Sequence, residues 1–135
     1  MSILSLVFLF TIKHYLADFQ FQTSYMYLNK GTWMHPGGLI HSGLHGLMTM
    51  LILYFVDISI IEIICFAILD FGCHYIIDYF KINITKKYGW AKYDKDSSGK
   101  GALCIYDNKF FIALGIDQMM HWLTYCLILA LIVWI

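Results

Sequence analysis

Histidines and aspartates recur four residues apart inside the most apolar stretches of this sequence. The four pairs are His14 with Asp18, His41 with His45, His74 with Asp78, and Asp117 with His121. On an α-helix, side chains four residues apart lie on one face, one turn from each other. Imidazole nitrogens and carboxylate oxygens together are ligands for divalent ions such as zinc, iron and manganese. The pattern therefore predicts a metal-binding centre built from paired ligands on several helices.

Asp70 extends one of these polar faces, because it stands one turn before His74. Four acidic residues and five histidines thus occupy apolar surroundings, where ionisable side chains are costly and usually mark a functional site. Clustered carboxylates repel each other, so protonated histidines, lysines or metal ions must balance them. We predict one or two divalent ions per chain, zinc first, with manganese or iron as alternatives. The simpler interpretation of any single pair is a His–Asp hydrogen bond that only fixes helix register.

Each polar residue receives a predicted role. The predicted metal ligands are His14, Asp18, His41, His45, His74, Asp78, Asp117 and His121, of which His45, His74, Asp78, Asp117 and His121 form the inner set. Asp70 is the predicted catalytic residue, a spare carboxylate that handles protons. Gln22 and Gln118 border the cluster, either to orient ligands or as ordinary polar helix-end residues. Lys81 stands one turn after Asp78, so it is expected to pair with Asp78 or to extend toward lipid phosphates.

The elements that position these residues are predicted to lie in a membrane. Of the 135 residues, 60% are hydrophobic and 13% are charged, whereas soluble domains contain about 25% charged residues. A chain of this length cannot bury so much apolar surface in one water-surrounded core. We expect an integral membrane protein, with the lipid bilayer as its partner. A soluble enzyme and a disulfide-stapled secreted domain are excluded, and no nucleic acid is expected because nine lysines balance nine acidic residues.

Four apolar runs approach the about 20 residues that a membrane-spanning helix needs. They cover residues 1–21, 39–56, 58–80 and 110–135, and residues 81–109 form one long loop. The sequence therefore predicts an all-α membrane protein, a single domain over residues 1–135 that forms a bundle of four transmembrane helices. The long loop carries Lys81, Lys86, Lys87, Lys92, Lys95, Lys100 and Lys109. Because lysines accumulate on the cytoplasmic side, we expect this loop in the cytoplasm and both termini outside.

The four His/Asp pairs share one predicted depth. Each lies within about three helical turns of the predicted cytoplasmic end of its helix, at about 1.5 Å per residue. The orientation is inferred from the lysines, and the depth is inferred from the helix ends. Neither inference uses the His/Asp positions, so the shared depth of the four pairs is independent evidence for one site. We therefore expect all four pairs in one layer, in the cytoplasmic half of the membrane.

Four stretches of the sequence together resemble a known family. HYLADFQFQ (14–22), HSGLH (41–45), HYIIDYFKI (74–82) and DQMMHWL (117–123) are similar to the signature stretches of small bacterial and phage membrane proteins catalogued as domain of unknown function 3307. The stretches occur in order, one on each predicted helix. The resemblance implies a multi-helix membrane protein that retains the His/Asp positions, and it brings no established activity.

Three classes of function remain open from the sequence. The first is a metal-dependent intramembrane hydrolase that acts on a lipid-linked, ester or phosphoester substrate from the cytoplasmic leaflet. The second is an ion- or proton-coupled transporter or relay, although four helices without an internal repeat are few for that task. The third is a non-catalytic membrane interaction module in which the His/Asp layer, with or without metal, is structural. Whether the chain is an enzyme, and whether it forms a homo-oligomer, stays open at this point.

Overall fold

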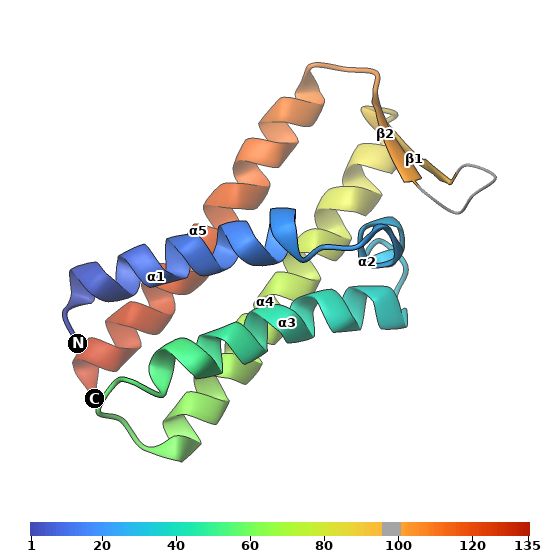
Figure 1. Cartoon of the computed structure of the whole chain (residues 1–135). Helices are drawn as coiled ribbons and strands as arrows, with labels where there is room; N and C mark the ends of the chain where they lie inside the picture. The colour runs from blue at the N-terminus through green and yellow to red at the C-terminus, as the bar shows by residue number, and fades with distance from the viewer. Residues whose placement is uncertain (96–100) are drawn as a thin grey trace.

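The structure is a computed structural model that describes residues 1–95 and 101–135, and it is mostly helical. Figure 1 shows the helices packed side by side, with the two chain termini close together at one end. In chain order the elements are α1 (Ile3–Tyr15), the π-helical turn η1 (Leu16–Gln20), α2 (Ser24–Asn29), α3 (Pro36–Leu53), α4 (Ile60–Lys87), β1 (Ala91–Lys95), β2 (Gly101–Ile105) and α5 (Lys109–Trp134).

The predicted helical character is confirmed, and the predicted all-α architecture needs one correction. The stretch expected as a single loop over 81–109 begins with the last two turns of α4 and then forms an antiparallel hairpin, in which Ala91 pairs with Ile105 and Lys95 with Gly101. The helix continues past residue 80 because Ile82 and Thr85 are buried and supply an inward face. Lys100 of the predicted loop lies outside the described residues. The first connection also contains the short helix α2.

Three helical segments are long and apolar enough to cross a membrane. They are Ile3–Gln20, which joins α1 and η1, together with α4 and α5. Helix α3 is 18 residues long, which corresponds to about 27 Å of helix. Its two histidines and four glycines lower its mean hydropathy. For this reason α3 is not one of the three candidate membrane-spanning segments.

Side-chain caps set where the helices begin. Ser59 and Glu62 form a capping box at the start of α4, in which Ser59 Oγ accepts from Glu62 N at 3.3 Å and Glu62 Oε2 accepts from Ser59 N at 2.7 Å. His35 Nδ1 accepts from Gly37 N at 3.0 Å at the start of α3, and Pro36 occupies the first turn. Proline at that position loses no helical hydrogen bond, so it helps to fix where α3 begins. The start of the helix in turn sets the face on which His41 and His45 lie.

Close packing of α3 on α4 brings the histidines of both helices together. A Cβ atom at Gly46 would lie 2.9 Å from the carbonyl oxygen of Ala67 on α4, so only glycine permits this approach. Small residues have this role in membrane helix pairs generally. The end of the bundle near the termini holds an apolar core that includes Leu6, Phe10 and Phe66. The polar residues lie further along the bundle, toward α2 and the hairpin.

Candidate metal centre

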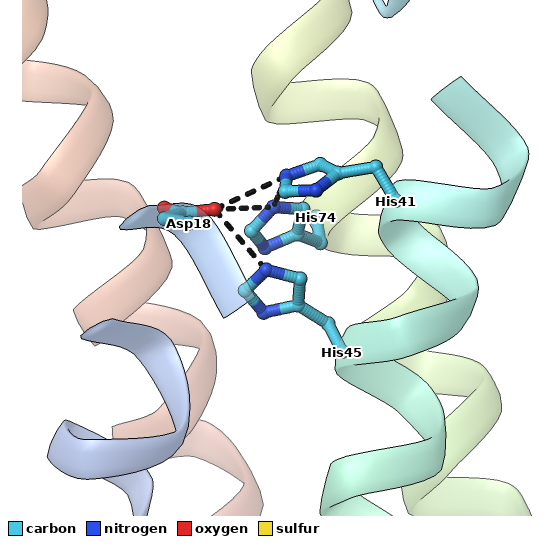
Figure 2. A group of neighbouring side chains, drawn as sticks. All are labelled: Asp18, His41, His45 and His74. Carbon is cyan, nitrogen blue, oxygen red and sulfur yellow. Dashed lines mark hydrogen bonds and ion pairs between the residues drawn. The ribbon is translucent and has the colours of Figure 1, made fainter. Parts of the chain in front are cut away.

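Three histidines converge on the carboxylate of Asp18. Asp18 Oδ1 lies 3.1 Å from His41 Nε2, 3.1 Å from His45 Nε2 and 3.6 Å from His74 Nε2. Figure 2 shows the three imidazole rings directed toward Asp18 from α3 and α4. All three histidines are at most 1% exposed. The structure thus joins residues from three separate apolar runs into one group of four potential ligands.

A second group shares a histidine with the first. His74, Asp78 and His121 offer ligand atoms that all lie within 4.8 Å of one another. Asp78 Oδ2 is 3.4 Å from His74 Nε2 and also 3.2 Å from His41 Nε2. Since His74 belongs to both groups, the two form one continuous centre. Together they contain six of the eight predicted ligands.

Four separations among the ligand atoms are close to those expected in a tetrahedral metal site. Zinc–nitrogen distances of about 2.0–2.1 Å imply about 3.3–3.4 Å between neighbouring ligand atoms in a tetrahedron. The observed separations among Asp18 Oδ1 and the three Nε2 atoms include 3.1 Å between His41 and His74 and 3.1–3.6 Å to the carboxylate. The donor set, nitrogen and carboxylate oxygen, is also one that zinc, iron and manganese accept. The buried groups are therefore arranged so that they could hold a metal ion.

Ring stacking orients the histidines of the centre. The His45 and His74 rings are stacked with centroids 3.5 Å apart, and the His74 and His121 rings are stacked at 4.1 Å. The Nδ1 atoms of His41, His45 and His74 have no hydrogen-bond partner within residues 1–95 and 101–135. Metal-bound histidines commonly use that second nitrogen to fix the ring. Here the stacked neighbours restrict the ring orientation instead.

A π-helical turn carries Asp18 to the centre. In η1, the Phe21 N–H bonds to the Leu16 carbonyl oxygen at 2.9 Å, a step of five residues where an α-helix takes four. Such turns occur mostly as local insertions at functional sites. Gln22 Nε2 donates to the Asp18 carbonyl oxygen at 2.6 Å, so this predicted supporting residue holds the backbone of the turn.

His14 and Asp117 lie at the edge of the centre, outside the two ligand groups. His14 Nε2 is 3.2 Å from Asp18 Oδ2 and 2.9 Å from Gln118 Oε1, so His14 links Gln118 to the Asp18 carboxylate. Asp117 Oδ1 is 3.6 Å from His121 Nε2. Gln118 Nε2 also donates to Asp117 Oδ2 at 3.2 Å. Both glutamines predicted to border the site therefore contact predicted ligands.

Two buried lysines lie beside carboxylates, and the sequence-based assignment included neither Lys30 nor Lys13. Lys30 Nζ lies 3.0 Å from Asp78 Oδ2, and both side chains are almost fully buried. Burial opposes the charge of Lys30, but the carboxylates of Asp78 and Asp18 outweigh it and raise the lysine pKa above its usual value. Lys81, which was expected near Asp78, instead has Asp117 Oδ2 as its neighbour at 3.9 Å. The requirement for positive charge near clustered acids was the only sequence signal for Lys30.

Asp70 lies apart from both ligand groups. The Lys13 ammonium donates to Asp70 Oδ2, and Thr49 Oγ1 donates to the same oxygen at 2.6 Å. Lys13 Nζ also approaches the Tyr125 hydroxyl at 3.4 Å, and that hydroxyl is 2.9 Å from His14 Nδ1. Among the described residues, Asp70 is linked to the centre through this run of hydrogen bonds and does not itself contact the ligand atoms.

The comparisons with known proteins identify a family but no activity. The model of the family described as "Protein of unknown function (DUF3307)" matches residues 6–135. No curated protein and no solved structure matches the chain.

Proposed function

This chain belongs to the DUF3307 family, and we propose that it is an intramembrane metal-binding protein, a hydrolase that cleaves an ester or phosphoester bond in a lipid-linked substrate. The observation that carries the proposal is the convergence of three histidine Nε2 atoms on Asp18 Oδ1 at 3.1–3.6 Å. A carboxylate oxygen in a hydrogen-bonded network commonly accepts two hydrogen bonds, one for each lone pair. Three nitrogens around one oxygen are the arrangement that a shared cation explains.

The proposed ligands are Asp18, His41, His45 and His74, and a second ion would use His74, Asp78 and His121. A divalent ion supplies Lewis acidity and lowers the pKa of a coordinated water toward neutrality. Zinc is our first choice, with manganese or iron as alternatives. Lys30 places a positive charge beside Asp78 through their 3.0 Å contact. We propose a positioning role for Asp70, because it binds Lys13 and Thr49 and does not touch the ligand atoms.

We further propose that α3 joins the three candidate spans in a four-helix transmembrane bundle with both termini outside. Helix α3 packs closely on α4 through Gly46, and its 18 residues approach the about 30 Å hydrocarbon thickness. The lysines of residues 81–109 support a cytoplasmic hairpin. This orientation puts the metal centre in the cytoplasmic half of the bilayer, and we propose the bacterial inner membrane as its location.

Transport is the weaker alternative. The polar contacts run from Asp18 through His14, Tyr125 and Lys13 to Asp70. Toward the termini, the neighbouring core of the described residues is apolar and includes Leu6, Phe10, Leu53, Ile63 and Phe66. A conduction path needs polar groups along its whole length, whereas a hydrolytic site open to one leaflet does not. A purely structural centre would bind metal without chemistry, and an activity assay separates that case.

The decisive experiment measures metal content by elemental mass spectrometry on protein purified in detergent without chelator. We expect near-stoichiometric zinc, manganese or iron in the unaltered chain and its loss in Asp18→Asn and His74→Ala. Asp57→Asn is the matched control, because it removes the same charge at an exposed position outside the centre and is expected to retain the metal. No metal above background, even after divalent ions are added back, would overturn the proposal. Release of phosphate or carboxylate from long-chain esters, lost in Asp18→Asn, then tests the hydrolase assignment.

A further inference from the structure

An elongated groove lies between α4 and α5 on the outside of the bundle. Its volume is about 370 Å³, within the range of about 300–1,000 Å³ that is usual for ligand sites. Its walls are two rows of apolar residues, each with a spacing of four: Ile76, Phe80 and Ile84 on α4, and Ile112, Ile116 and Met120 on α5. All six side chains are more than 40% exposed. On helices proposed to span a membrane, these walls open toward lipid.

The floor of the groove includes two charged residues, although its exposed surface is almost entirely apolar. Lys81 and Asp117 both line it. Their side chains are 13% and 3% exposed, and Lys81 Nζ stays 3.9 Å from Asp117 Oδ2, beyond hydrogen-bond distance. No other ion pair of Lys81 occurs within the part of the chain that the structure describes. A desolvated ammonium with so distant a partner favours a further anion.

The floor continues into the metal centre. Asp117 Oδ1 and His121 Nε2 lie 3.6 Å apart, and both are buried without a hydrogen-bond partner among residues 1–95 and 101–135. His121 belongs to the ligand group with His74 and Asp78. A head group bound at Lys81 would therefore lie beside the residues proposed to hold the second ion.

We propose that the groove between α4 and α5 binds one hydrocarbon chain of an anionic amphiphile and that Lys81 pairs with its phosphate head. The apolar walls match the chain and the buried ammonium matches the anion. Ala113, at the wall of the groove, leaves the room that a larger residue would fill. The inference that this amphiphile is the substrate rests on the proposed function. The inference that the groove binds the amphiphile does not depend on it. The groove then serves as the entrance from the bilayer to the centre.

The test uses the full chain in lipid nanodiscs and an alkyl phosphate that carries a photoreactive diazirine in its chain. After irradiation, mass spectrometry maps the labelled peptides and competition gives relative affinities. We expect labelling concentrated on residues 76–84 and 112–120, displaced by dodecyl phosphate at least about tenfold better than by dodecanol. Inorganic phosphate is expected not to displace the probe, which separates a lipid phosphate from free phosphate. Labelling spread evenly over all exposed helix faces, or equal displacement by dodecanol, overturns the proposal.

Two pairs of variants sharpen the result. Lys81→Gln is expected to weaken the alkyl phosphate about tenfold, whereas Lys87→Gln removes the same charge at an exposed position of α4 and leaves binding unchanged. Ala113→Leu is expected to block the groove, whereas Ala130→Leu adds the same volume at an exposed position of α5 and has no effect. Unchanged binding in Lys81→Gln or Ala113→Leu contradicts the proposal.

Metal content distinguishes this proposal from the preceding one. All four variants are expected to keep the metal of the unaltered chain, because none removes a proposed ligand. Specific labelling of the groove in a chain without metal would overturn the proposed function and leave the amphiphile site standing. Stoichiometric metal together with unspecific labelling would overturn the amphiphile site and leave the proposed metal centre standing.

Discussion

The ammonium of Lys30 lies 3.0 Å from Asp78 Oδ2, although all of α3 and more than half of α4 lie between the two residues in the chain. Lys30 follows α2, outside the predicted apolar runs, yet its side chain is only 8% exposed. A Cβ atom at Gly38 would lie 3.1 Å from Lys30 Cα, so the start of α3 makes room for the lysine backbone. The first connection of the chain is therefore part of the polar centre.

Removal of the Lys30 charge is expected to destabilise the fold strongly. Lys30→Met leaves the buried Asp78 carboxylate without its cation, and breaking such a pair costs about 3–5 kcal/mol. Lys92→Met is the control, because Lys92 pairs with Asp94 at the surface with 60% of its side chain exposed, where an ion pair contributes little to stability. Chemical unfolding of both variants in detergent gives the comparison. Equal stability of the two variants would show that the Lys30 pair contributes little.

The approach of α3 to α4 can be tested at two glycines of α3. Gly46→Ala places a Cβ atom 2.9 Å from the Ala67 carbonyl oxygen, and overpacking of this kind costs about 1–3 kcal/mol. Gly43→Ala meets no atom within 4 Å and is expected to stabilise the helix by about 0.5–1 kcal/mol. Opposite shifts in thermal unfolding temperature are therefore expected from the same chemical change. Destabilisation by both substitutions would mean that helix packing at Gly46 is not the cause.

Metal removal is expected to lower the unfolding temperature of the unaltered chain. An ion that binds only the folded state stabilises it by about 2.7 kcal/mol at one hundred times its dissociation constant. Chelator treatment followed by titration with zinc should lower and then restore the unfolding temperature. Asp18→Asn should abolish the response, and Asp57→Asn should keep it. A response of equal size in Asp18→Asn would remove that carboxylate from the proposed ligand set.

The native cysteines report the proposed orientation. Cys104 is exposed on β2, in the hairpin proposed to face the cytoplasm, whereas Cys65 and Cys126 are exposed on the helices α4 and α5. A membrane-impermeant maleimide is expected to label Cys104 only after the cells are opened. Cys104→Ser should lose this label and provides the control. Labelling of Cys104 in intact cells would reverse the proposed orientation.

The helical character and the polar residues of the centre were accessible from the sequence because both signals are local. A long apolar run predicts a helix, and a spacing of four places His74 beside Asp78 whatever the rest of the chain does. The depth estimate also depended only on helix ends. The predicted ligand set therefore required only local spacing and no knowledge of how the helices pack.

The tertiary structure decided which of those residues meet. The π-helical turn that directs Asp18, the closeness of α3 and α4 at Gly46 and the burial of Lys30 beside Asp78 depend on contacts between distant segments. The residue pattern of a single segment cannot predict these features, because each depends on how two or more helices pack against one another. For the same reason the sequence grouped Asp117 with the inner ligands and left Asp18 outside, whereas packing brings Asp18 into the four-residue group.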